Sequence, residues 1–196
     1  MADEEVQNTI SKLMEKARAA QSVAADYSQQ QVDDVCLAAG WEVYNDENIR
    51  KLATAAVEET GMGNVEDKIK KHKGKILGVL DDIQGAVSVG LIEEIPEEGI
   101  RKYAKPVGVV GGLTPVTNPT ATPGSNAITV LKGRNAVIFA PHPKAKRSSK
   151  MAVDFMRQGL AKIGAPEDLV QIIEEPSIEL TNELMRQADM VLATGG

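Results

Sequence analysis

Residues 105–140 read KPVGVVGGLTPVTNPTATPGSNAITVLKGRNAVIFA, and this stretch decides the fold. It holds two short, mostly apolar runs, at 107–110 and 136–140, with a helical pattern at 125–131 between them. Continuous apolar strands joined by a helix are typical of a parallel sheet covered on both faces, because the chain must return to the same end of the sheet after each strand. The stretch therefore predicts a right-handed βαβ unit.

The same alternation continues downstream. A helix is expected through Ile163, and Gly164 followed by Pro166 is the usual way for such a helix to end. Two more apolar runs follow, at 169–173 and 190–193, with a helix at about 177–187 between them. The repeat predicts an α/β fold with a Rossmann-type parallel sheet.

The first part of the chain is expected to be helical. Apolar residues recur at helical spacing in four stretches, namely 6–17, 32–43, 49–57 and about 66–80. Ser28 with Gln31 is a capping-box pattern that opens the second helix, and the glycines at 61–63 end the third. The helix expected at 6–17 either binds a partner or packs on its own domain, and we favour packing.

The period changes near Gly85. Residues 86–92 are expected to form an extended strand, and the acidic residues 93–98 are expected to form a turn. This arm either pairs with another subunit or folds as a hairpin within one subunit, and the sequence leaves both open. The expected organisation is a helical part at 1–84, an arm at 85–104 that is a candidate oligomerisation element, and an incomplete nucleotide-binding part at 105–196.

Composition excludes several function classes. The net charge of −6 argues against binding to a nucleic-acid backbone, which requires a cationic surface. No apolar run is long enough for a membrane span, and the acidic N-terminus is unlike a signal peptide. A single cysteine, Cys36, is consistent with a reducing, cytoplasmic setting. His72 and His142 lie far apart without a ligand cluster, so no metal site is expected.

Ligands of open parallel sheets bind at the carboxyl ends of the strands. The corresponding loops here are 111–122, 141–147, 174–177 and 194–196. In the first, Asn118 lies between prolines and could serve only the turn. The second has three cations and no acidic residue where a Rossmann-type site meets the adenosine ribose, so a 2′-phosphate could be tolerated there. NAD and NADP both remain open.

Several motifs, in order, carry a resemblance to a known family. They are YSQ at 27–29 with QVD at 31–33, ETGMG at 59–63 with EDK at 66–68, AKPVGVV at 104–110, TPVTNP at 114–119, KGRN at 132–135, APHPKAK at 140–146, GAPE at 164–167 and LATGG at 192–196. With these, the chain resembles the CoA-acylating branch of the aldehyde dehydrogenase superfamily over nearly its whole length. The branch includes the CoA-dependent succinate-semialdehyde and sulfoacetaldehyde dehydrogenases and the aldehyde dehydrogenase part of the aldehyde-alcohol dehydrogenases.

The resemblance implies a mechanism and a set of site residues. In the family a cysteine thiolate attacks the aldehyde, hydride passes to NAD(P)+, and the acyl group passes to coenzyme A. Asn118 matches the family asparagine whose amide helps to hold the oxyanion, and it is the catalytic residue expected in this chain. The positions expected around the dinucleotide are Thr114, Pro115, Ala140, His142, Pro143, Pro176, Thr194, Gly195 and Gly196.

The family nucleophile is expected beyond residue 196, in a catalytic domain that this sequence lacks, so we expect this piece alone to be inactive. Cys36 lies on the apolar stripe of an early helix, where thiols are usually inert. The last binding loop is cut at Gly196, which we interpret as a truncation.

The function expected of the parent protein is NAD(P)-dependent oxidation of a short, anionic aldehyde to its acyl-CoA, in a cytoplasmic homo-oligomer. A bacterial microcompartment is compatible with the sequence but not indicated by it. The alternatives are a non-acylating relative that releases a free acid, or an inactive nucleotide-binding or assembly module of this length.

Overall fold

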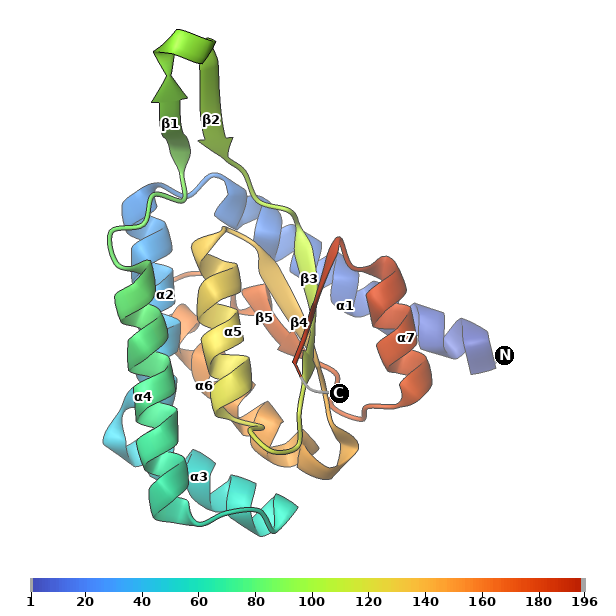
Figure 1. The fold of residues 1–196 in the computed structure, drawn as a ribbon. Helices are drawn as coiled ribbons and strands as arrows, with labels where there is room; N and C mark the ends of the chain where they lie inside the picture. Colours follow the sequence, from blue (N-terminus) through green and yellow to red (C-terminus); the bar gives the residue numbers. More distant parts are fainter. Residues whose placement is uncertain (1, 195–196) are drawn as a thin grey trace.

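The chain folds around a parallel sheet, as the sequence predicts. A computed structural model describes residues 2–194 (Figure 1). Four parallel strands lie in the order β5-β4-β3-β6. Their bounds are β3 Val109–Thr114, β4 Ala136–Pro141, β5 Val170–Ile172 and β6 Met190–Ala193. The connecting helices are α5 Ala121–Lys132, α6 Lys146–Lys162 and α7 Ile178–Gln187. The predicted βαβ alternation is therefore confirmed.

The order of the strands creates a switch point. The chain passes from β3 to β4 to β5 in one direction. It then crosses back over β4 and β3 and places β6 on the other side of β3. Helices α5 and α6 cover one face of the sheet, and α7 packs with α1 (Ala2–Ala25) on the other (Figure 1). Ligands of such doubly wound sheets bind outside the carboxyl ends of the strands where the order reverses, which is between β3 and β6 here.

The four predicted N-terminal helices are all present. They are α1, α2 (Gln29–Tyr44), α3 (Asp46–Thr60) and α4 (Val65–Ile83). The capping box forms as predicted, since the Ser28 hydroxyl accepts from the N–H of Gln31 while the Gln31 side chain accepts from the N–H of Ser28. Gly61 ends α3 with a φ of 65°, in the left-handed region that favours glycine. Helix α1 packs on α7 and β4, as we favoured for its apolar stripe.

The predicted loop at residues 111–122 is wrong at both ends. Strand β3 continues to Thr114, because Gly111 and Gly112 pair with β4 and β6 on either side. A Cβ on Gly112 would lie 2.6 Å from the ring of Phe139, so only glycine leaves room for this buried aromatic side chain. Helix α5 begins at Ala121 rather than at residue 125, since Pro123 is tolerated in a first turn. The loop is therefore residues 115–120.

The arm is a hairpin, but its strands differ from the predicted ones. Strand β1 is Gly90–Ile95 and pairs antiparallel with β2, Ile100–Ala104, so residues 86–89 are not strand and 93–95 are. The turn is set by the 3-10 helix η1 (Pro96–Glu98) and by Gly99 with a φ of 66°. Glu97 and Glu98 lie in this turn, as expected. Glu93 and Glu94 lie instead on β1, where they form ion pairs with Lys102 and Arg101. Figure 1 shows the hairpin projecting from the body.

The KGRN motif anchors the base of this arm. The Arg134 guanidinium donates to the carbonyl of Ala25 at 2.7 Å and to that of Ala104 at 2.9 Å, so it joins the end of α1 to the end of β2. The carboxamide oxygen of Asn135, which is buried, accepts from the N–H groups of Val107 at 2.6 Å and Gly108 at 3.1 Å. These bonds fix the direction in which β3 enters the sheet.

Within residues 2–194, no helix combines the length and the apolar character that a membrane crossing requires.

Candidate functional site

The carboxyl ends of the strands bring most of the predicted site residues to one edge. Thr114, the last residue of β3, pairs in register with Pro141, the last residue of β4. On the other side of β3, the N–H of Thr194 donates to the carbonyl of Leu113 at 3.1 Å. Thr114 and Thr194 therefore flank the switch point. Gly195 and Gly196, which we predicted to complete this loop, lie outside the described residues.

Thr114 is the first sign of a ligand at this edge. Its side chain is only 6% exposed, and its hydroxyl has no hydrogen-bond partner among the described residues. A buried hydroxyl without a partner costs free energy unless water or a ligand satisfies it. Ala140 is also buried, opposite Leu113 in the β3–β4 register, while Pro115 is half-buried just after β3.

A small cleft of about 150 Å³ opens at the carboxyl ends of β4 and β5. Prolines from three separate positions form part of its wall, and two of them, Pro143 and Pro176, are predicted site residues. The lining is Pro141, Pro143, Pro176, Ser177, Ile178, Thr181 and Asn182. An apolar slot with a few polar groups is the usual character of a site for a flat ring.

His142 has a structural role in the loop after β4. Its Nδ1 accepts from the N–H of Lys144 at 3.1 Å and caps the 3-10 helix η2 (Pro143–Ala145). The ring is exposed and does not line the small cleft. Among the predicted site residues, His142 therefore lies beside the cleft rather than in its wall.

The loop that carries Asn118 is held rigidly from two sides. The hydroxyl of Ser149, on α6, donates to the carbonyl of Pro119 at 2.9 Å, and His72 Nδ1, on α4, lies 3.3 Å from the hydroxyl of Thr120. Both anchoring side chains are fully or nearly fully buried. Burial lowers the pKa of His72 to about 4, so its imidazole is neutral near pH 7. Asn118 itself is half-buried.

The sequence reasoning missed one acidic residue at this edge. Glu59, in the last turn of α3, accepts from the N–H of Arg147 at 2.8 Å and from the N–H of Ser148 at 2.7 Å. A carboxylate therefore lies at the start of α6, where the local sequence offers only cations. The expectation that no acidic residue is present there is wrong, because the residue comes from 88 positions upstream. No local pattern in residues 141–147 could have indicated it.

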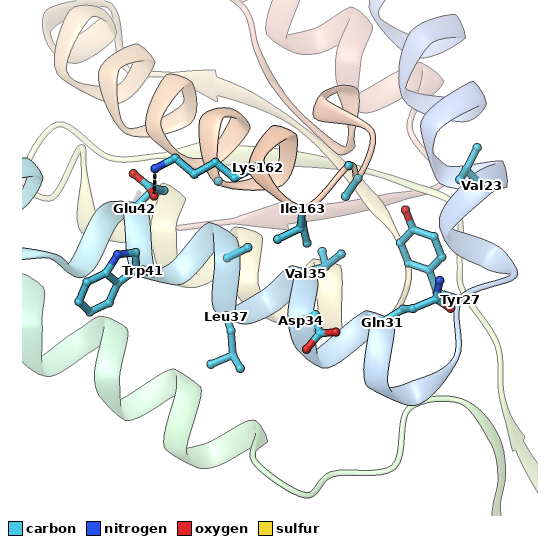
Figure 2. A pocket seen from close by; sticks show the side chains of 14 residues that line it. Val23, Tyr27, Gln31, Asp34, Val35, Leu37, Trp41, Glu42, Lys162 and Ile163 are labelled. Atoms are coloured by element: carbon cyan, nitrogen blue, oxygen red, sulfur yellow. Dashed lines mark hydrogen bonds and ion pairs between the residues drawn. The ribbon is translucent and has the colours of Figure 1, made fainter.

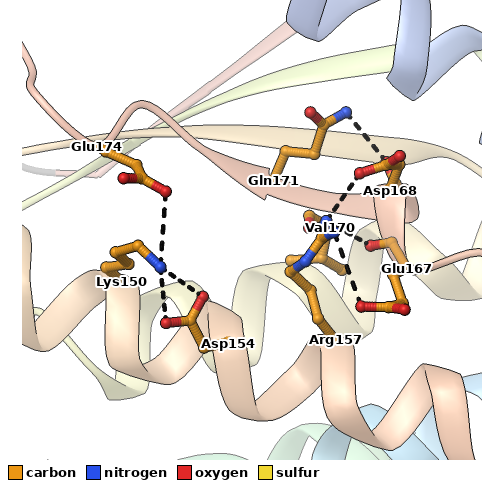
Figure 3. A network of polar contacts seen from close by, with 8 residues as sticks. All are labelled: Lys150, Asp154, Arg157, Glu167, Asp168, Val170, Gln171 and Glu174. Carbon is orange, nitrogen blue, oxygen red and sulfur yellow. Dashed lines mark hydrogen bonds and ion pairs between the residues drawn. The ribbon is translucent and has the colours of Figure 1, made fainter.

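A second polar network holds both ends of β5 against α6 (Figure 3). Arg157 donates to the carbonyl of Val170 at 3.1 Å and to the Asp168 carboxylate at 2.9 Å. Near the site, Lys150 pairs with Asp154 on its own helix and with Glu174 just after β5. The backbone that leads to Pro176 is thereby positioned relative to α6.

A second hollow lies between α2 and the C-terminal end of α6 (Figure 2). It has a volume of about 710 Å³ and is formed by α2 and by the C-terminal end of α6, where Glu42 pairs with Lys162. A helix of 17 residues is roughly 25 Å long, so this end of α6 is far from the loops at its start. The exposed Trp41 and Leu37 contribute to its wall. The hollow is not the candidate site.

Cys36 is also separate from the site, as expected. It lies on α2, is 2% exposed, and its thiol donates to the carbonyl of Ile128 at 3.6 Å. Burial raises the pKa of the thiol to about 12, so it carries no thiolate near neutral pH.

Comparisons with known proteins identify the family of this chain. The sequence profile of the aldehyde dehydrogenase family matches residues 2–196. A sulfoacetaldehyde dehydrogenase of Acholeplasma sp is 71% identical over 93% of this chain and 38% of its own length. The acetylating succinate-semialdehyde dehydrogenase of Clostridium kluyveri is 48% identical over 96% of this chain and 41% of its own. The chain thus spans about two fifths of such relatives.

Solved structures show the same fold. An acetylating aldehyde dehydrogenase of Geobacillus thermoglucosidasius superposes over all of this chain and 43% of its own with a TM-score of 0.93, at 35% identity. Two others, both with a TM-score of 0.83, carry ligands: a propionaldehyde dehydrogenase of Rhodopseudomonas palustris with bound CoA and an acylated cysteine, and an engineered glycolyl-CoA reductase with NADP+. The chain therefore belongs to the aldehyde dehydrogenase family, and it is similar to the N-terminal part of the family's acylating members.

Proposed function

We propose that this chain is the nucleotide-binding part of an enzyme that oxidises a short, anionic aldehyde to its acyl-CoA. The overall reaction takes an aldehyde, coenzyme A and NAD(P)+ and gives the acyl-CoA, NAD(P)H and a proton. The nicotinamide nucleotide supplies the hydride acceptor, and a cysteine outside this chain forms the thioester that is passed to coenzyme A. The high identity to acylating relatives over nearly the whole chain carries this proposal.

The residues at the carboxyl edge support a nucleotide site there. The switch point between β3 and β6 is where an open sheet of this order binds a dinucleotide, and the unpartnered hydroxyl of Thr114 lies there. The apolar cleft at Pro143 and Pro176 suits the adenine ring. The nucleotide site that we propose comprises Thr114, Pro115, Ala140, His142, Pro143, Pro176, Thr194, Gly195 and Gly196.

Asn118 is the catalytic residue that we propose for this chain. Its amide would donate a hydrogen bond to the oxyanion that forms when the cysteine attacks the aldehyde. Such a donor works only if it is already in place before charge develops. The hydrogen bonds from Ser149 and with His72 hold the flanking residues Pro119 and Thr120, which supports that role.

The anionic character of the aldehyde is supported by a cationic face beside this loop. Lys68, Lys71 and Lys75 recur at helical spacing on α4 and so share one face. The ammonium of Lys68 lies 3.5 Å from the carbonyl of Thr117, and that of Lys75 lies 3.3 Å from the hydroxyl of Thr122.

Among residues 2–194, the polar partners of Lys68 and Lys75 are a carbonyl and a hydroxyl rather than carboxylates. Burial, followed by the charge of Lys71, lowers the pKa of both Lys68 and Lys75. Among residues 2–194, the lysine of α4 that forms an ion pair with a carboxylate is Lys73, which is bound to Asp46. An anionic group close to Asn118 would relieve the repulsion within the cluster.

The arm is the oligomerisation element that we propose. Its strands expose the large apolar side chains of Leu91, Ile92, Ile100 and Tyr103. A two-stranded hairpin exposed on both faces is marginally stable in water, so pairing with a second subunit would stabilise it. Light scattering on the full-length protein tests this: Leu91→Lys with Tyr103→Lys should lower the oligomeric state, and an unchanged mass would contradict the role.

One assay tests the proposed function. The full-length protein is given sulfoacetaldehyde, succinate semialdehyde or neutral propionaldehyde, with NAD+ or NADP+, with and without coenzyme A. We expect CoA-dependent reduction of the nucleotide, fastest with an anionic aldehyde, and an acyl-CoA product. Equal turnover without coenzyme A and release of a free acid would instead assign the non-acylating reaction. No turnover with any aldehyde would favour an inactive nucleotide-binding or assembly module.

A further inference from the structure

The carboxylate of Glu59 caps helix α6. Both of its oxygens are used, with the N–H of Arg147 at 2.8 Å from one and the N–H of Ser148 at 2.7 Å from the other. The residue before α6, Ala145, offers no side-chain cap of its own. The free N–H groups and the dipole at the start of a helix favour an anion, and in this molecule a side chain from α3 supplies it.

The start of α6 has a defined place in a dinucleotide site. Helix α6 follows β4, the second strand of the β3–α5–β4 unit. In sheets of this kind, the residues at the carboxyl end of the second strand meet the 2′ position of the adenosine ribose. An acidic residue there accepts a hydrogen bond from the 2′-hydroxyl of NAD, whereas a 2′-phosphate requires free donors and cations.

Two further observations support a ligand site at this edge. Thr114, at the end of the neighbouring strand, is a buried hydroxyl without a partner among the described residues. Helix α3, which carries Glu59, packs against η2, whose Pro143 lines the apolar cleft. Glu59 therefore lies next to the cleft on the side of β4.

The cations near α6 are partly neutralised. Lys146, the first residue of α6, forms an ion pair with Glu175, which follows β5. The carboxylates of Glu59 and Glu175 thus both lie at the start of this helix. Of the three cations at 141–147, Lys146 has an anionic partner for its ammonium group, and the backbone N–H of Arg147 donates to Glu59.

We propose that Glu59 is a specificity-determining residue that makes this site select NAD over its 2′-phosphorylated form. A 2′-phosphate would have to displace the carboxylate from the N–H groups of Arg147 and Ser148, or lie beside it. In the second case two negative charges would be neighbours and would repel each other strongly. This inference rests on the proposed function, because it requires that the site binds a nicotinamide dinucleotide.

Binding measurements on the full-length protein test the inference without turnover. Isothermal titration calorimetry gives the Kd of NAD+ and NADP+ for the wild type, for Glu59→Gln and for the control Glu58→Gln, an exposed neighbour. Adenosine 2′,5′-bisphosphate and AMP serve as probes that lack the nicotinamide. We expect the wild type to bind NAD+ at least about tenfold more tightly than NADP+, and Glu59→Gln to reduce this ratio about tenfold or more.

The possible outcomes distinguish the role of Glu59 from the proposed function. A wild type that binds neither nucleotide contradicts the proposed function itself. Tight binding of NAD+ with an unchanged ratio in a folded Glu59→Gln variant overturns the role of Glu59 and leaves the function intact. If Glu59→Gln does not fold, the ratio of the Kd of NADP+ to the Kd of NAD+ in the wild type is the test. A ratio below tenfold overturns the inference. A ratio above tenfold, together with tighter binding of AMP than of adenosine 2′,5′-bisphosphate, supports it.

Discussion

The side chains of Arg18 and Asp189 are joined by two hydrogen bonds, from Nη1 to Oδ2 at 2.8 Å and from Nη2 to Oδ1 at 3.1 Å. Asp189 Oδ2 also accepts from the N–H of Val109 at 2.8 Å. The hydrogen bond from Arg18 is the main reason why the pKa of Asp189 is lower than usual. One carboxylate thus ties α1 to the starts of the central strand β3 and of β6.

Gly108 is the residue that makes this tie sterically feasible. Its φ is 124°, and a Cβ at this position would lie 2.2 Å from Asp189 Oδ2. We expect Gly108→Ala to lower the free energy of unfolding by about 2 kcal/mol or more, because it adds both backbone strain and a clash. Chemical denaturation of the full-length protein measures this. Gly74→Ala, in open space on α4, is the matched control and should not destabilise; equal stability of both variants would refute the account.

His72 predicts a dependence of stability on pH. Its pKa is about 4 in the folded protein because of burial, against about 6.5 in an unfolded chain. Between these values the unfolded state binds more protons, so the free energy of unfolding falls as the pH falls, by about 2 kcal/mol between pH 7 and pH 5. Denaturation at several pH values should show a flatter profile for His72→Gln than for the wild type. Parallel profiles would show that His72 does not titrate in this way.

Asn118→Ala tests the proposed oxyanion donor. Removing one preorganised donor typically lowers kcat by about 10²–10³-fold, and we expect a loss of that size in the full-length enzyme. The Kd of NAD+ should stay the same, because the amide would act on the aldehyde oxygen. A weaker affinity for the nucleotide with little change in kcat would instead assign Asn118 to the turn.

Lys68→Met tests the cationic face of α4. We expect KM to rise about tenfold for sulfoacetaldehyde and to change little for propionaldehyde, because only the former carries an anionic group. Lys70→Met, an exposed residue outside the 68–71–75 face of the same helix, is the control. A similar rise of KM for both aldehydes in Lys68→Met would mean that Lys68 supports the Thr117 loop and does not select the substrate.

Cys36 should be chemically inert in the native enzyme. Its thiol is buried and its pKa is about 12, so the reactive thiolate is absent at pH 8. Mass spectrometry of iodoacetamide-treated full-length protein should show no label on Cys36 before unfolding and full label after it. Rapid labelling of Cys36 in the folded state would mean that α2 opens readily.

The sequence predicted well whatever is encoded locally. Ser28 and Gln31 predicted the start of α2, Gly61 the end of α3, and the apolar runs the four parallel strands, because each pattern lies within a few residues of the structure it determines. The strands of the arm were predicted at the wrong residues because their bounds depend on pairing between two separate segments. Glu93 and Glu94 resemble turn residues in the sequence, but they pair with Lys102 and Arg101 on the second strand.

The site was less predictable because its parts come from distant places in the chain. Glu59 reaches Ser148 across 89 positions, and His72 reaches Thr120 across 48. No periodic pattern in the sequence predicts either contact, since both depend on how α3 and α4 pack in the folded protein. The proline cleft was partly foreseen, but only from the resemblance of the motifs around Pro143 and Pro176 to a family.

The bond between Arg18 and Asp189 also has a consequence for synthesis on the ribosome. The two residues are 171 positions apart, and at about 5–20 residues per second their translation is separated by roughly 10–30 s. During this interval α1 has emerged, but α7, the element with which it makes most contact, does not yet exist. The apolar stripe of α1 therefore lacks part of its packing surface in the nascent chain until α7 has been made.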